Sequence, residues 1–130
     1  MLQDIRTRSD IENIITTFYT TVRADADLGY LFDEVARVNW QQHIPIITDF
    51  WEQIVLGTGE YHRNAMEPHF LLHKKSPLTA LHFTKWLQHF TTTIDMLHSG
   101  EKADNMKERA ASIASVMQYK IISQNSGKLM

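Results

Sequence analysis

Cysteine is absent from the 130-residue sequence, and glycine and proline are scarce, with five and three residues respectively. A chain without cysteine forms no disulfide, no thiolate metal site and no thiol nucleophile, and its composition suits a reducing compartment. The length suits one domain that buries roughly two thirds of its extended surface. We therefore expect a single domain over residues 1–130, with flexible ends at 1–8 and 123–130.

A strong charge bias and a long apolar run are also missing. The 13 lysines and arginines nearly balance the 15 acidic residues, and the basic residues form no cluster longer than "HKK". Nucleic acid and anionic membranes are therefore not expected partners. No apolar run approaches the roughly 18 residues that span a bilayer, and the charged "MLQDIRTRSD" start does not resemble a secretion signal. These absences predict a soluble, cytoplasmic protein.

Apolar residues at three-and-four spacing dominate the first half of the chain. The capping box "SDIE" predicts a helix that begins at Ser9 and ends near Ala24. One or two helical turns are expected over residues 28–36, and a long helix over 40–56 that stops at the glycines of "GTG". Pro45 fits this helix in its first turn, where the missing N–H costs no helical bond.

The second half continues the helical pattern. A short, irregular helix is expected over residues 64–73 and a long one over 79–98. An apolar stripe from Lys102 to Ile121 predicts a last helix, with "SQNSGKLM" as a frayed tail. No segment favours a strand, so the predicted fold class is all-α, and a plain helical bundle is the simplest interpretation.

Polar side chains interrupt three of the apolar stripes. His43 lies in line with Ile47, Phe50 and Trp51, which follow it at four, seven and eight residues. Tyr19 and Trp86 hold similar positions on their helices. A buried polar group without a partner costs about 1–3 kcal/mol. Each tip therefore either bonds a backbone carbonyl in the core or meets a ligand.

Three kinds of chemistry could use these residues or other histidines of the chain. His69 and His73, four residues apart on a helix, could chelate zinc, but no third ligand is evident. A hydrolase is disfavoured because no serine lies in a nucleophile-elbow pattern and no carboxylate is placed to orient a histidine. A haem site would account for all three polar side chains at once. One histidine would ligate the iron, long apolar helices would form a slot, and the polar side chains would meet a diatomic ligand.

Four segments carry a resemblance to a known family. They are "FYTTVRADADLGYLF", "WQQHIPIITDFWEQIVLG", "EYHRNAMEPHFLLH" and "LTALHFTKWLQHF", and they span residues 18–90. Their order and content resemble the truncated haemoglobins of the third group, small bacterial globins with a shortened or missing first helix. The resemblance implies a globin-like, truncated two-over-two helical sandwich around haem b.

The resemblance also assigns residues to roles. It makes His69 the iron ligand and places Tyr19, His43 and Trp86 on the opposite, ligand-binding side. The implied apolar wall consists of Phe18, Phe32, Ile47, Phe50, Trp51 and Leu72. Arg63, Lys74 and Lys75 are the candidates to meet the haem propionates.

Reversible binding of oxygen, and of other diatomic gases such as NO and CO, is the function that these roles imply. O–H and N–H donors beside such a ligand stabilise the negative charge it acquires. Two alternatives stay open. One is redox chemistry on O2, NO or peroxide, such as nitric oxide dioxygenation, with a separate reductase because the chain has no reductase domain. The other is a non-haem helical sensor or interaction domain in which the polar tips bond one another.

Overall fold

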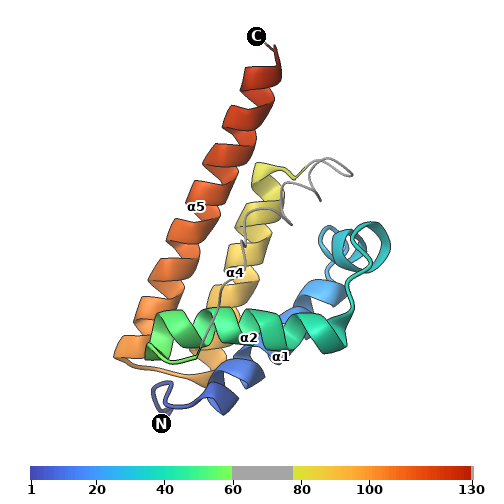
Figure 1. Cartoon of the computed structure of the whole chain (residues 1–130). Coiled ribbons are helices and arrows are strands. Elements are labelled where there is room, and N and C mark those ends of the chain that lie inside the picture. Colours follow the sequence, from blue (N-terminus) through green and yellow to red (C-terminus); the bar gives the residue numbers. More distant parts are fainter. Residues whose placement is uncertain (60–77, 130) are drawn as a thin grey trace.

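The computed structural model describes residues 1–59 and 78–129, where all the regular structure is helical. The elements are α1 (Arg8–Ala24), the short η1 (Leu31–Val35), α2 (Trp40–Leu56), α4 (Ala80–Leu97) and α5 (Glu101–Leu129). Figure 1 shows α4 and α5 side by side, with α1 and α2 crossing them near the N-terminus. Within each pair the two helices contact each other, and contacts of α1 with α4 and of α2 with α5 join the two pairs. The all-α prediction is confirmed.

The start of α1 differs from the sequence prediction. Thr7, rather than Ser9, is the N-cap, and its side chain accepts from the Asp10 N–H at 3.3 Å. The Asp10 carboxylate in turn accepts from the Thr7 N–H at 3.1 Å. Two overlapping boxes, "TRSD" and "SDIE", compete here, and the first one forms. The earlier start places Arg8 in the helix, where it pairs with Asp49 and Glu52 of α2 at 2.6 and 2.9 Å.

A wide helical turn, η1, follows α1, within the residues predicted to form one or two turns. Its backbone bonds span five residues, as between the Ala36 N–H and the Leu31 carbonyl at 2.8 Å. Gly29 lets this connection close on the end of α1, because a Cβ there would lie 2.4 Å from the Arg23 carbonyl oxygen.

The bounds of α2 match the prediction, but the position of Pro45 does not. Asn39 caps the helix, and Gly57 ends it in the left-handed conformation with φ 72°. Pro45 is the sixth helical residue and so lies beyond the first turn. The Gln41 carbonyl therefore has no N–H four residues on. Both residues are exposed, so water can satisfy that carbonyl.

The N-terminal ends of α4 and α5 are capped in different ways, one by the preceding residue and one by a residue distant in sequence. Thr79 caps α4, and α4 ends at Leu97, in agreement with the predicted range. Asp4 caps α5 by accepting from the Lys102 and Ala103 N–H groups, both at 2.9 Å. The sequence pattern gave no sign of this contact. α5 continues as a helix to Leu129, through the segment predicted to be frayed. The flexibility of the two ends stays a prediction.

Aromatic rings from three helices meet at the centre of the core. Phe90 is fully buried and stacks on Trp86 with ring centres 5.2 Å apart. Phe18 meets Phe90 edge-on at 4.9 Å, and Trp51 lies 5.1 Å from it. This cluster fixes how α1, α2 and α4 cross. Over the described residues, no helix is both long and apolar enough for a membrane crossing.

Candidate functional site

A cavity of about 180 Å³ lies among α1, η1, α2, α4 and α5. It brings together the predicted site residues that the structure describes, namely Tyr19, Phe32, His43, Ile47, Phe50, Trp51 and Trp86. Phe18 lies behind this lining, in the core, with its ring against Tyr19 and Trp86. The predicted residues Arg63, His69, Leu72, Lys74 and Lys75 lie outside the described residues.

Other lining residues were not predicted. Leu28 comes from the α1 to η1 connection and Leu31 from η1, and α5 supplies Ile113, Ala114 and Met117. The α5 residues belong to an apolar stripe that the sequence does show. That stripe predicted a helix with a buried face, and periodicity alone does not tell which surface the face meets.

The Tyr19 hydroxyl is the most buried polar group at the site. Its side chain is held between Phe18 at 4.9 Å and Trp40 at 4.9 Å, measured between ring centres. Burial raises the pKa of the Tyr19 hydroxyl, which therefore keeps its proton at neutral pH. A protonated hydroxyl can donate one hydrogen bond and accept others. Tyr19 is thus a donor that pH does not remove in the physiological range.

His43 decides where that donor is directed. Its Nε2 lies 3.3 Å from the Tyr19 hydroxyl oxygen. When Nε2 carries no proton, it accepts from Tyr19 and occupies the hydroxyl hydrogen. When Nε2 is protonated, it donates to Tyr19 and leaves the hydroxyl hydrogen to another acceptor in the cavity. The pair can therefore present either an engaged or an available O–H donor.

Trp86, on α4, supplies a second donor at the cavity wall. Its ring is fixed by stacking on Phe90 and by the edge of Phe18 at 5.7 Å. Within the part of the chain that the structure describes, the Trp86 indole N–H has no hydrogen-bond acceptor. A donor-only group at a cavity wall without a protein partner is suited to a ligand that accepts a hydrogen bond.

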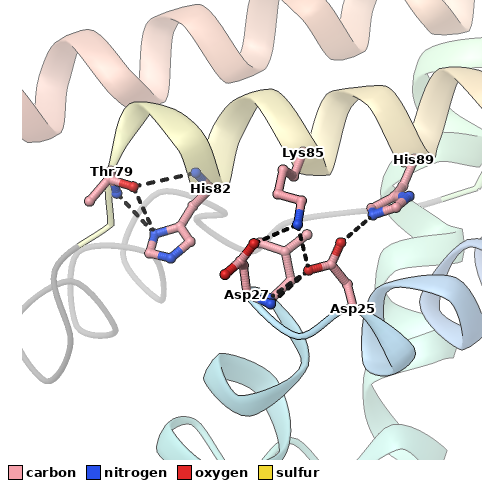
Figure 2. A network of polar contacts seen from close by, with 7 residues as sticks. Asp25, Asp27, Thr79, His82, Lys85 and His89 are labelled. Carbon is pink, nitrogen blue, oxygen red and sulfur yellow. Dashed lines mark hydrogen bonds and ion pairs between the residues drawn. The ribbon is translucent and has the colours of Figure 1, made fainter.

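His82 is a polar lining residue that the sequence did not single out. The Thr79 N–H donates to its Nδ1 at 3.0 Å, and the His82 N–H donates to the Thr79 hydroxyl oxygen at 3.4 Å (Figure 2). Because Nδ1 accepts, the neutral ring carries its proton on Nε2. The cap of α4 thus sets the tautomer of a histidine at the cavity edge.

A network of ion pairs joins the α1 to η1 connection to α4. Figure 2 shows Lys85 and His89 reaching from α4 toward Asp25 and Asp27. The Asp25 carboxylate accepts from His89 Nε2 at 2.7 Å and from Lys85 Nζ at 3.1 Å. The expectation that no carboxylate orients a histidine is therefore wrong, since residues 64 apart in sequence meet here. The network holds Leu28, which lines the cavity, against the Trp86 helix.

The lining of the cavity suits a mostly apolar ligand that takes a few hydrogen bonds. Aliphatic and aromatic side chains form most of the lining, and the polar tips of Tyr19, His43 and His82 occupy a small part of it. Sites of this kind bury a flat ring system and direct a few donors at one place. The Trp86 N–H, which has no acceptor among residues 1–59 and 78–129, adds a donor that a ligand in the same cavity could use.

Comparison with known proteins decides the family. Residues 3–120 match the family model of the bacterial-like globins. The chain is a bacterial-like globin. A relative, the Group 3 truncated hemoglobin ctb of Campylobacter jejuni subsp. jejuni serotype O:2, is 29% identical over 114 residues, which are 85% of this chain and 87% of the relative.

The globin also matches a solved structure. The crystal structure of group III truncated hemoglobin from Campylobacter jejuni superposes with a TM-score of 0.80 at 27% identity. The match covers 93% of this globin and 95% of that chain. It confirms the resemblance to the third group and the globin-like fold. Membership of the globin family supports haem as the cofactor of the cavity.

Proposed function

We propose that this globin binds haem b in the cavity and reversibly binds oxygen there, with NO and CO as further ligands. The observation that carries the proposal is the set of donors on an apolar wall. Tyr19 is buried and protonated, and Trp86 has no acceptor among the described residues. Haem, when bound, supplies the iron that takes up the gas. The protein supplies the slot, the donors and the exclusion of water.

The donors act on charge that develops on a gas ligand. Oxygen accepts more electron density from iron than CO does, so hydrogen bonds favour oxygen over CO. Tyr19 and Trp86 belong to α1 and α4, and both rings are fixed by the same aromatic core. Fixed donors need little reorganisation when the ligand arrives. The geometry therefore suits tight and selective retention of oxygen.

The remaining assignments belong to the same proposal. His69 would ligate the iron, with its second ring nitrogen held by an acceptor that sets its orientation. Leu72 would complete the apolar wall, and Arg63 and Lys74 would meet the propionates. These roles rest on the position of the residues in the family motif, and the described cavity wall supplies the opposite side.

Haem reconstitution tests the proposal. The purified globin should gain a Soret band with one equivalent of haem, and its ferrous visible bands should change on exposure to oxygen and return when oxygen is removed. His69→Ala should weaken haem binding by two or more orders of magnitude, because an iron ligand is lost. His73→Ala is the matched control, since it removes a histidine from the same segment. A wild-type protein without a Soret band, or a larger loss in His73→Ala, would contradict the proposal.

A further inference from the structure

Trp40 is held at the surface by one residue from α1 and one from η1. Its indole Nε1 donates to Asp33 at 3.0 Å, and the Arg23 Nε donates to the same carboxylate at 3.2 Å. The Arg23 guanidinium also lies over the Trp40 ring, 5.0 Å from its centre. We call these three residues the Trp40 clamp. The clamp fixes the ring by its edge and by one face.

The inner side of Trp40 meets the two polar residues of the ligand pocket. Its ring centre lies 4.9 Å from that of Tyr19 and 5.6 Å from that of His43. Trp40 and His43 are three residues apart on α2, so they share one face of the helix. The His43 ring therefore has Tyr19 and Trp40 as neighbours. The Trp40 ring therefore packs directly beside the His43 ring that contacts Tyr19.

The clamp is built of exposed charges, which contribute little to folding. The Arg23 and Asp33 side chains are 49% and 36% exposed, and ion pairs this accessible add little to stability. A hydrogen bond and a stacked cation that add little to the free energy of unfolding still restrict where an aromatic ring can lie. The contacts are thus better suited to placing Trp40 than to holding the fold together.

From these contacts we infer that Trp40, held by Asp33 and Arg23, is a positioning residue that keeps His43 against Tyr19. The inference deepens the proposed function and rests on it. While His43 accepts from Tyr19, the hydroxyl hydrogen is engaged within the protein. Release of Trp40 frees His43 to leave, and the Tyr19 hydroxyl then donates to the gas ligand. The clamp therefore sets how strongly the site retains oxygen.

Two variants of the clamp test the inference in the haem-loaded protein. Trp40→Phe keeps an aromatic ring and loses the N–H, and Asp33→Ala removes the shared acceptor. Both should slow oxygen dissociation about three- to tenfold, a range typical of positions that act through a neighbour. Both should also lower the C–O stretching frequency of the CO complex, because a hydrogen bond donated to CO weakens the C–O bond. Asp33→Asn keeps an acceptor and should restore most of the wild-type behaviour.

The matched control is Asp49→Ala. Asp49 pairs with Arg8 and joins α1 to α2, but it does not line the cavity. Its loss should leave oxygen dissociation and the C–O band unchanged. An equal effect in Asp49→Ala would overturn the inference, because general loosening would then explain the data. Unchanged oxygen dissociation in both clamp variants would overturn it as well.

Nuclear magnetic resonance of the haem-free protein tests the positioning role of Trp40 separately from the proposed binding of haem and oxygen. With 5-fluorotryptophan, the Trp40 signal is assigned by its disappearance in Trp40→Phe, and the His43 ring protons by His43→Gln. Asp33→Ala should move both signals, and Asp49→Ala should move neither. Stationary His43 signals would overturn the positioning role. A wild-type protein that binds no haem would refute the proposed function. The NMR signals would then still test whether the Trp40 clamp positions His43.

Discussion

The connection between α1 and α2 is anchored on two sides by contacts of different kinds. Toward α4, Asp25 and Asp27 meet Lys85 and His89 in a compact ionic network (Figure 2). Toward α2, Asp33 holds the Trp40 indole. Both anchors centre on an aspartate and lie beside the same cavity. They differ in how far that aspartate is removed from water.

Burial separates the two aspartates. The Asp25 side chain is 8% exposed, whereas that of Asp33 is 36% exposed. Burial alone would raise the Asp25 pKa, but hydrogen bonds from His89, the Asp27 N–H, Lys85 and the Leu28 N–H outweigh it and hold the pKa far below its ordinary value. The Asp33 pKa is also lowered, chiefly by the Trp40 N–H. The contacts of Asp25 are therefore suited to stabilising the fold, and those of Asp33 to positioning a ring.

The largest expected effect comes from breaking the buried anchor. Asp25→Ala removes the acceptor of two side chains and of the Asp27 and Leu28 N–H groups. We expect the free energy of unfolding to fall by about 2–4 kcal/mol, because partly buried donors lose their partner. Urea denaturation followed by circular dichroism measures it.

Asp27→Ala is the control for that loss. Its side chain is 49% exposed, and among the described residues its carboxylate forms an ion pair with Lys85. Removing it should cost less than about 1 kcal/mol. Equal losses of unfolding free energy in Asp25→Ala and Asp27→Ala would show that the burial of Asp25 gives it no special role in stability.

Acid should weaken the buried anchor in wild type. The Asp25 pKa is lowered in the folded state, so its ionised form contributes stability that is fully present above the unfolded pKa near 4 and is lost as pH falls below it. The gap in unfolding free energy between wild type and Asp25→Ala should therefore narrow progressively below about pH 4.5. Denaturation curves at several pH values measure the gap. A gap that is constant down to pH 3 would contradict the role of the charge.

Helix positions could be predicted because their signals are local. Gly57 ends α2 at the predicted place since the left-handed cap is a property of one residue. The N-cap of α1 was predicted two residues too late, at Ser9 and not Thr7, because two overlapping capping boxes compete there. Pro45 was expected in the first turn, and an exposed carbonyl let it lie deeper. Local sequence patterns thus predicted where the helices lie. Their exact first and last residues depend on which of several neighbouring caps forms.

The candidate site was predictable in part for the same reason. Tyr19, His43 and Trp86 stood out because each is a polar tip on an apolar stripe. The contacts that place them join distant segments, as between Asp25 and His89, and no periodicity encodes such pairs. Trp40 was noted as a helix start and as part of the family motif but was given no role at the site, although its indole links Asp33 to the Tyr19 ring. Sequence patterns indicate which side chains face inward, and the packing of segments decides which of them meet.

The smallest expected effect concerns the exposed anchor. Arg23→Gln removes the cation of the Trp40 clamp and leaves the Asp33 acceptor for the indole N–H. The free energy of unfolding should change by less than about 1 kcal/mol, since both charges are well exposed. About 1 M salt should erase the difference from wild type, because charges at such sites are screened over roughly 3 Å. The Asp25→Ala loss should largely persist in the same salt, since Asp25 accepts four partly buried hydrogen bonds, two of them from backbone N–H groups. Denaturation of both variants in low and in high salt measures the two changes in unfolding free energy. A loss in Arg23→Gln that persists in high salt would show that the two anchors do not differ in this respect.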